Sequence, residues 1–486
     1  MMSATDTPRM STTDMTVVDA QPTAGTSTEQ TGTSTETTAT APPLTLQDEY
    51  GAMDNSDLYF HLASFALESG MVLDNVRVAY RTWGSLSTEA DNCLVVPHAL
   101  TGNAAVDTWW AALLGHGKAL DTSRYFVVGV NMLGSPYGTT SPLDEFPEHA
   151  AWITPRGAAR AEGAAGRRYA ADFPNCTIRD NVRLQQLLLI QLGVRSVHAV
   201  IGGSAGGMQA LEWAVMYPAY VQRAAVLACG AKQCAWQIAI GETQRRAIYR
   251  DPLWNDGFYS LDDPPVHGLA IARENAMVWY RSAEAYDDKF GRHEQVTSPG
   301  SVSRRALDKS GGGGRGAPPS FAVEGYLEHQ GQKFVDRFDG NCYVALTRTL
   351  DSHDVTRGRG SLGEVLGGVQ LPVLVAGITS DVLYPLHMQR ELAACLPRAT
   401  LRVIESAQGH DAFLLESNVI GGMIRELLAT SVRGESEAPP ATAPPKPILL
   451  PTAEVLSHVS AEALAKRKAA NIEGTRTAGS LGAVAW

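Results

Sequence analysis

One serine in the chain has the neighbours of an enzymatic nucleophile. Residues 202–207 read GGSAGG, between an apolar run at 197–201 and a helix-like stretch at 208–217. This pattern predicts a sharp strand-to-helix turn with Ser204 at its tip, where the flanking glycines avoid steric clashes. The N–H of Ala205, at the start of the helix, would then face an oxyanion formed when Ser204 attacks a carbonyl. We therefore expect acyl-transfer chemistry; the alternative is a glycine-rich turn that only packs tightly.

A nucleophilic serine needs a base and a carboxylate that orients the base, and both are expected after later strands. Asp381 follows an apolar run at 373–378, and His410 follows another at 401–405. In the predicted mechanism His410 removes the Ser204 proton while Asp381 holds the imidazole. This set predicts an acyl-enzyme but leaves the acceptor open: water would make the protein an esterase, and an alcohol would make it a transferase.

The second oxyanion donor is expected in the loop after an earlier strand. An apolar run at 93–97 is followed by His98, Ala99, Leu100, Thr101 and Gly102. We predict that the backbone N–H of Leu100 acts with that of Ala205. His98 is assigned a structural role because His410 already serves as the base.

The elements that must position these residues follow an alternating pattern. Short apolar runs separated by helical stretches predict a largely parallel sheet covered on both faces. The predicted strands are 93–97, 126–130, 197–201, 224–228, 373–378 and 401–405. The block at about 232–368 has helical patterns at 266–281 and 323–338 but no strand pattern, so it predicts a helical lid over the carboxyl edge of the sheet. The run Gly311–Gly314 is expected to be a loop on this lid.

The two ends of the 486-residue chain differ in composition from its middle. Residues 1–46 are rich in Thr, Ser and Ala, and residues 433–486 include a Pro-Ala-rich run, so both are predicted to be disordered tails. Residues 47–432 are then one folded domain. The first tail resembles neither a secretory signal nor a transit peptide, which favours the cytoplasm.

Composition argues against several classes of partner. The net charge of −11, without a basic stripe, disfavours nucleic acid. No apolar run reaches the 18 or more residues expected of a membrane span. The six cysteines are scattered and lack C-x-x-C pairs, so we expect reduced thiols and no zinc site.

Several motifs together resemble the homoserine O-acetyltransferase family over roughly residues 50–430. The motifs are HALTG (98–102), GKALDTSRYF (117–126), DFPNCTIRD (172–180), GGSAGGMQALEWA (202–214), SDVLYP (380–385) and GHDAFLLE (409–416). The string SPYG at 135–138 resembles the fungal branch. The resemblance implies an α/β-hydrolase fold with a helical lid. It also implies a homodimer that transfers acetyl groups by a ping-pong mechanism from acetyl-CoA to the hydroxyl of L-homoserine, for methionine biosynthesis. No metal or redox cofactor is expected, because a base activates the nucleophile.

The resemblance also assigns substrate-binding residues. Arg273 matches the family arginine that holds the amino-acid carboxylate, Tyr280 matches a tyrosine seven residues later, and Asp411 matches the carboxylate for the substrate ammonium. Positions 273 and 280 are nearly two helical turns apart and share a face. The family usually has methionine at position 205, so Ala205 keeps the N–H but reduces the volume of the pocket wall.

Some alternatives stay open at this point. Related branches acylate serine or a cephalosporin alcohol, or use succinyl-CoA. An esterase could use the same acyl-enzyme, and a non-catalytic interaction protein could keep the fold and bind through its tails. A pocket that holds both charges of an amino acid favours the transferase.

Overall fold

The computed structural model describes residues 46–48, 51–53, 58–146, 167–294 and 321–432. Apart from Leu46, the predicted tails at 1–46 and 433–486 lie outside these ranges, as does the predicted loop at Gly311–Gly314.

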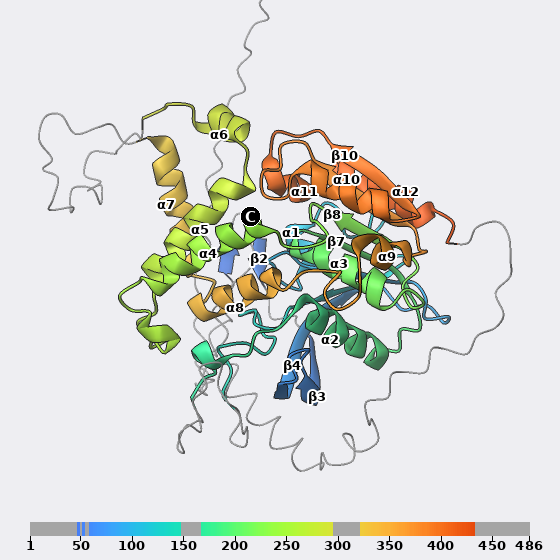
Figure 1. Ribbon diagram of the computed structural model, residues 1–486, viewed down its shortest axis with the longest axis horizontal. Helices are drawn as coiled ribbons and strands as arrows, with labels where there is room; N and C mark the ends of the chain where they lie inside the picture. Colours follow the sequence, from blue (N-terminus) through green and yellow to red (C-terminus); the bar gives the residue numbers. More distant parts are fainter. Residues whose placement is uncertain (1–45, 49–50, 54–57, 147–166, 295–320, 433–486) are drawn as a thin grey trace, which may run out of the picture. The chain divides into compact units, whose positions relative to one another are not determined.

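Among the described residues, eight strands form one sheet in the order β10-β9-β8-β7-β5-β6-β4-β3 (Figure 1). Their bounds are β3 Leu58–Ala66, β4 Val72–Trp83, β5 Cys93–Pro97, β6 Phe126–Val130, β7 Val197–Gly203, β8 Ala224–Leu227, β9 Val373–Ile378 and β10 Ala399–Ile404. Strands β5 to β10 pair in parallel, which confirms the mostly parallel sheet. Strand β8 ends one residue earlier than predicted because Ala228 has a φ of 47°.

The sequence prediction missed the antiparallel edge of the sheet. Strand β4 pairs antiparallel with both β3 and β6. Along β3 and β4, exposed or half-buried residues interrupt the buried ones, whereas β5, β8 and β9 are buried at every position. The search for continuous apolar runs therefore found β5, β8 and β9, which are covered on both faces, and missed β3 and β4. A separate pair of short strands, β1 (Leu46–Asp48) and β2 (Gly51–Met53), is antiparallel.

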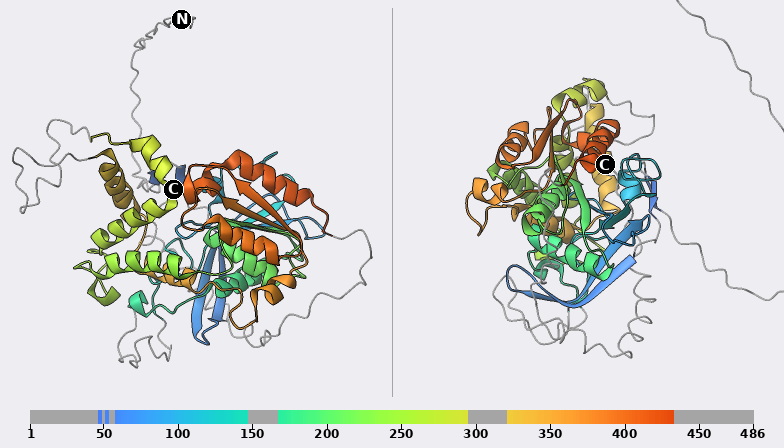
Figure 2. Two further views of the ribbon diagram at one scale, coloured as in Figure 1. Left: turned by 45° about the horizontal axis from the view of Figure 1, so that its top comes forward. Right: turned by 90° about the vertical axis from the view of Figure 1, so that its right-hand side faces the viewer.

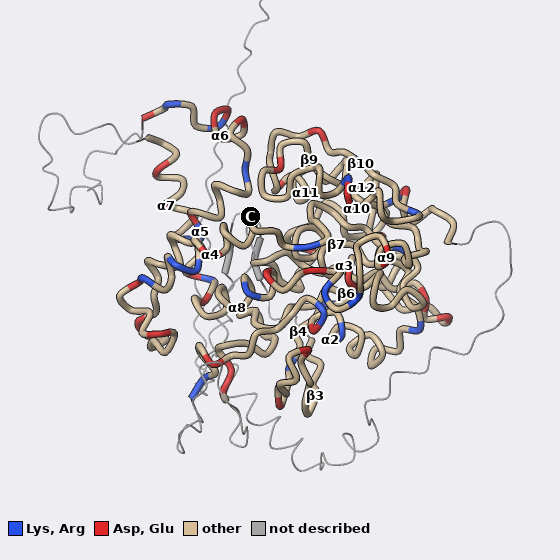
Figure 3. The backbone as a smooth tube through the Cα atoms, in the orientation of Figure 1, with Lys and Arg blue, Asp and Glu red and all other residues tan. Residues whose placement is uncertain are grey.

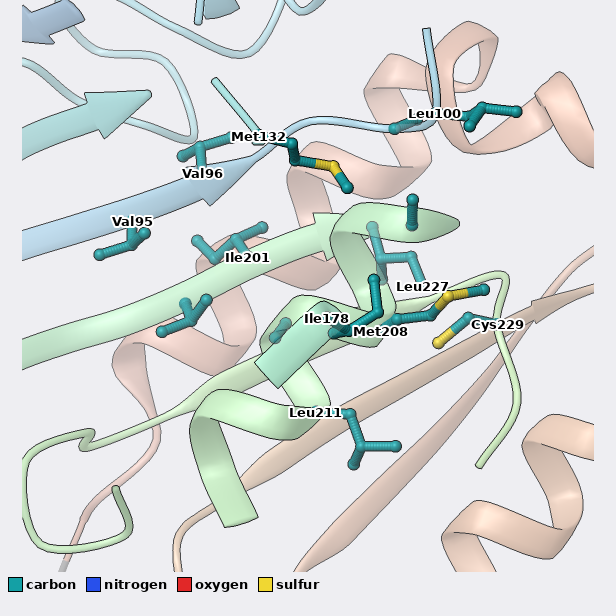
Figure 4. Close-up of a cluster of buried hydrophobic side chains, with 14 of the residues drawn as sticks. Val95, Val96, Leu100, Met132, Ile178, Ile201, Met208, Leu211, Leu227 and Cys229 are labelled. Atoms are coloured by element: carbon teal, nitrogen blue, oxygen red, sulfur yellow. The ribbon is translucent and has the colours of Figure 1, made fainter. Parts of the chain in front are cut away.

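Helices pack against the sheet and fix the turn at Ser204. The helices outside the block between β8 and β9 are α1 Val106–Trp109, α2 Ile178–Gln191, α3 Ala205–Met216, α10 Leu386–Cys395, α11 Ala412–Leu415 and α12 Ser417–Ala429. Figure 4 shows Met208 and Leu211 of α3 in one buried cluster with Val95, Ile201 and Leu227 of the strands. Each such side chain contributes about 1.5–3 kcal/mol on burial. This packing fixes the start of α3 against the end of β7.

The described residues between β8 and β9 form helices, as predicted. They are α4 Ala235–Tyr249, α5 Val266–Tyr280, α6 Ala283–Phe290, α7 Ala322–Val335, α8 Gly340–Asp351 and α9 Leu362–Gly367. Figures 1 and 2 show α4, α5 and α7 grouped apart from the helices that cover the sheet. Helix α7 ends three residues earlier than predicted, because Asp339 already caps α8 through the N–H of Cys342. The function of this block as a lid stays a prediction.

Charged residues are spread over both the sheet region and the helical block (Figure 3). In the described ranges, we find no helix with the length and apolarity needed to cross a membrane.

Candidate active site

The structure places Ser204 on the predicted turn between β7 and α3. Its backbone has φ 57° and ψ −124°, a conformation that costs a non-glycine residue on the order of 1–3 kcal/mol. A Cβ on Gly202 would lie 2.3 Å from the Gly206 carbonyl oxygen, and one on Gly206 would lie 2.2 Å from the Pro97 carbonyl oxygen. Both glycines are therefore required for this turn. The Ser204 hydroxyl does not cap α3.

Asp381 and His410 form a buried pair beyond the ends of neighbouring strands. Asp381 follows β9, and His410 lies in the 3-10 helix η4 (Gly409–Asp411) after β10. The Nδ1 atom of His410 is 2.7 Å from Oδ2 of Asp381. Because a carboxylate only accepts, Nδ1 carries a hydrogen, so in the neutral ring the lone pair lies on Nε2. The other carboxylate oxygen, Oδ1, accepts from the N–H groups of Leu383 and Tyr384, at 2.8 Å each.

The segment that carries His410 packs against the turn that carries Ser204. The ring centroids of His410 and Phe413 are 5.4 Å apart, and a Cβ on Gly203 would lie 2.3 Å from the Phe413 ring. No side-chain hydrogen bond of Ser204 is found among the described residues. Hydrogen bonds between a nucleophile and its base are often long before substrate binds.

The two predicted oxyanion donors belong to segments in close contact. The Pro97 carbonyl, just before the loop with Leu100, meets Gly206 at the start of α3. Within the described part of the chain, neither the Leu100 N–H nor the Ala205 N–H donates to a protein acceptor. Both are therefore available to an oxygen of a substrate.

His98 is buried and fixed to the backbone through both ring nitrogens. Its Nδ1 donates to the Ala99 carbonyl at 2.7 Å, and its Nε2 accepts from the Met132 N–H at 3.0 Å. Burial lowers the pKa of His98 to about 4. A neutral ring that orders the loop agrees with the structural role predicted for this residue.

This environment predicts a pH-dependent loss of stability. An unfolded histidine has a pKa of about 6.5, so the unfolded state binds a proton more readily than the native state as the pH falls. The contribution of neutral His98 to stability is present above pH 6.5 and decreases toward pH 4. We expect the contribution of His98 to the free energy of unfolding, measured with urea, to be about 2 kcal/mol smaller at pH 5 than at pH 7.

The pH dependence should be measured against two variants. His98→Asn should show a shallower loss of stability between pH 7 and pH 5, whereas replacement of the exposed His387 by asparagine should leave it unchanged. Equal slopes for wild type and His98→Asn would contradict the assignment.

The structure brings the three predicted substrate-binding residues around His410. Arg273 and Tyr280, on α5, are buried, and the guanidinium carbon lies 5.7 Å from the Tyr280 ring centroid. The Tyr280 ring is in turn 6.1 Å from that of His410. Burial raises the pKa of Asp411, an effect that Arg281, His410 and Arg273 oppose electrostatically.

Several neighbours of the site were not predicted. Nε of Arg281 lies 3.2 Å from Oδ2 of Asp411. The buried Arg337 donates to the Tyr137 hydroxyl at 2.6 Å and to the Thr101 carbonyl at 3.3 Å. Tyr137 lies in the SPYG string, but spacing alone gave no sign that a distant arginine would contact it.

A mostly parallel sheet with a strained serine after one strand and an Asp-His pair after two later strands is the arrangement of the α/β-hydrolase fold. A family model described as the alpha/beta hydrolase fold matches residues 92–417. A homoserine O-acetyltransferase of Salinibacter ruber is 45% identical over 365 residues, which cover 74% of this chain and 94% of the relative. The homoserine O-acetyltransferase of Saccharomyces cerevisiae is 38% identical over 436 residues, which cover 77% of this chain and 86% of the relative. The chain therefore belongs to the homoserine O-acetyltransferase family.

Solved structures agree with this assignment. A homoserine O-acetyltransferase from Bacillus anthracis matches with a TM-score of 0.66 at 26% identity and covers 78% of this chain and 98% of its own. Esterase E22 matches with a TM-score of 0.64 at 24% identity, covering 76% of this chain and 99% of its own. At that identity the esterase shows the fold alone.

Proposed function

We propose that this protein transfers an acetyl group from acetyl-CoA to the side-chain hydroxyl of L-homoserine and so forms O-acetyl-L-homoserine. The observation that carries the proposal is identity of about 40% or more to homoserine O-acetyltransferases over most of their length. The buried Asp381–His410 pair beside the Ser204 turn supports a covalent route.

In the proposed first half-reaction, Nε2 of His410 takes the Ser204 proton as the serine oxygen attacks the thioester carbonyl. The N–H groups of Leu100 and Ala205 stabilise the negative oxygen. The tetrahedral intermediate then collapses, the C–S bond breaks, and CoA leaves as the thiol with the proton from His410. In the second half-reaction Nε2 of His410 takes the proton of the homoserine hydroxyl, whose oxygen attacks the carbonyl of acetyl-Ser204. The bond between the Ser204 oxygen and the acetyl carbon then breaks, and the serine oxygen leaves with the proton from His410.

The acceptor is a zwitterion, and the pocket offers both signs of charge. Arg273 can hold the carboxylate with two hydrogen bonds, because its planar guanidinium matches carboxylate geometry. Asp411 can take the ammonium, which would share this carboxylate with Arg281. A pocket of this kind favours an amino acid over water as the acyl acceptor.

Arg273→Ala should chiefly weaken homoserine binding. Loss of charge-assisted hydrogen bonds to a carboxylate corresponds to about 1.5–3 kcal/mol, so the KM for homoserine should rise by about 10- to 100-fold. The KM for acetyl-CoA should change less than twofold. Steady-state kinetics with each substrate varied in turn measure both effects.

Two further arginine variants serve as controls for this effect. Arg246→Ala, on the exposed side of α4, should match the wild type. Arg273→Lys should be only partly active, because it keeps the charge without the planar fork. An unchanged KM for homoserine in Arg273→Ala would refute the role of Arg273.

The reaction itself is tested with purified protein and acetyl-CoA, with and without L-homoserine, by following free thiol and the amino-acid product by mass spectrometry. Thiol release that requires homoserine and yields O-acetylhomoserine supports the proposal. Release that does not depend on an amino acid would indicate a hydrolase. Serine and succinyl-CoA as replacement substrates test the related branches.

We also propose, from the family resemblance, that the protein is a homodimer in the cytoplasm and that the helical block at about 232–368 covers the site as a lid. Sedimentation equilibrium and cell fractionation test the first two statements.

A further inference from the structure

A chain of buried hydrogen bonds lies behind Ser204. The indole Nε1 of Trp213 donates to Oε1 of Gln185 at 2.8 Å, and Nε2 of Gln185 donates to Oε1 of Gln209 at 2.6 Å. All three side chains are at most 1% exposed. Trp213 and Gln209 belong to α3, which starts directly after Ser204, whereas Gln185 lies on the neighbouring helix α2.

The chemistry of the three groups fixes the direction of this chain. An indole N–H only donates, so the amide oxygen of Gln185 must face Trp213. The NH₂ group of Gln185 then faces Gln209, and only the amide oxygen of Gln209 can accept from it. The NH₂ group of Gln209 must therefore point away from Gln185. The opposite amide orientation would place two donors against each other.

The NH₂ group of Gln209 contacts both segments that carry the proposed oxyanion donors. It lies 3.2 Å from the Ala205 carbonyl oxygen and 3.4 Å from the His98 carbonyl oxygen. Ala205 supplies one donor, and Leu100 lies two residues after His98. The NH₂ group of Gln209 is also 3.3 Å from the sulfur of Met132, and the backbone N–H of Met132 donates to the His98 ring. One amide thus links the start of α3 to the loop after β5.

We propose that Gln209 is a positioning residue for the oxyanion hole and that Trp213 orients it through Gln185. This inference rests on the proposed roles of Leu100 and Ala205. A preorganised oxyanion hole acts on the transition state more than on bound substrate. We call the hydrogen-bonded series Trp213, Gln185 and Gln209 the relay. Loss of one of its hydrogen bonds should lower kcat and leave both KM values nearly unchanged. A merely structural defect would instead lower the amount of folded enzyme.

The test compares Gln209→Met and Trp213→Phe, which remove one link each, with Tyr220→Phe as a matched control. The Tyr220 hydroxyl donates to the Val194 carbonyl at 2.7 Å, and Val194 lies just before β7, at the end of that strand opposite Ser204. The Tyr220 ring stacks on that of Trp213 with centroids 6.3 Å apart, and phenylalanine keeps this ring while it removes the hydroxyl. The first readout is kcat and KM with acetyl-CoA and homoserine. The second is the rate at which a fluorophosphonate labels Ser204, since its phosphoryl oxygen occupies an oxyanion hole. Thermal unfolding reports folding.

We expect Gln209→Met to lower kcat and the labelling rate by about 10- to 100-fold, with each KM within threefold of the wild type. Trp213→Phe should lower both rates by about 3- to 10-fold, and Tyr220→Phe by less than twofold. The relay is refuted if the folded Gln209→Met variant keeps both rates within twofold.

Two outcomes separate this inference from the proposed function. If Gln209→Met does not fold, Trp213→Phe decides, and rates equal to those of Tyr220→Phe refute the relay. If the wild type makes no product from homoserine but labelling slows in Gln209→Met as expected, the substrate assignment fails and the relay is supported.

Discussion

Ser204→Ala is expected to abolish formation of the acyl-enzyme and to lower kcat by about 10⁴- to 10⁶-fold. In the proposed mechanism the acetyl group is bonded only to the Ser204 oxygen, and His410 only takes and returns protons. No other residue can therefore replace Ser204 as the nucleophile. Any activity that remains would come from substrate binding and the oxyanion donors. Alanine removes one oxygen from a residue whose hydroxyl does not cap α3, so the fold should not change.

Mass spectrometry of the intact protein after brief exposure to acetyl-CoA measures this directly. The wild type should gain one acetyl group that homoserine removes, and Ser204→Ala should gain none. Ser196→Ala is the control for loss of a serine hydroxyl, because Ser196 lies directly before β7, at the end of the strand opposite Ser204. This variant should become acetylated as the wild type does. Full turnover in Ser204→Ala would show that the turn is only structural.

The central sheet and the order of Ser204, Asp381 and His410 along it could be predicted from the sequence for a local reason. Strands covered on both faces are continuous apolar runs, and the turn at Ser204 depends on two glycines within two residues of it. The antiparallel strands β3 and β4 could not be found in this way, because exposed and half-buried residues interrupt the buried ones along both strands.

The surroundings of the site depend on contacts that no local pattern encodes. Arg337 reaches Thr101 across more than 200 residues, and its environment is defined only when α7 and the loop after β5 meet. The relay from Trp213 through Gln185 likewise requires α2 beside α3. Gln209 could be seen in the GGSAGGMQALEWA string of the sequence, but the groups that its side-chain amide contacts could not be predicted from it. Tertiary packing decides which polar residues become buried and what they then orient.

The second large effect is expected for Asp381→Asn, which should lower kcat by about 10⁴-fold. Oδ1 of Asp381 accepts two backbone N–H groups, so the asparagine oxygen must occupy that position. The NH₂ group of the asparagine then takes the place of Oδ2 and faces Nδ1 of His410. Two donors cannot share this contact, so His410 shifts its hydrogen to Nε2. The lone pair that should take the Ser204 proton is then lost.

Single-turnover release of CoA measures this effect at the acylation step, and thermal unfolding shows whether the variant stays folded. Asp354→Asn is a matched control, because Oδ1 of Asp354 also accepts two hydrogen bonds, from the N–H and the hydroxyl of Thr356. We expect the control to react at the wild-type rate. An Asp381→Asn enzyme within tenfold of the wild type would mean that His410 keeps its tautomer without the carboxylate. The role of Asp381 would then be limited to holding the backbone of Leu383 and Tyr384 in place, which an asparagine oxygen can do equally well.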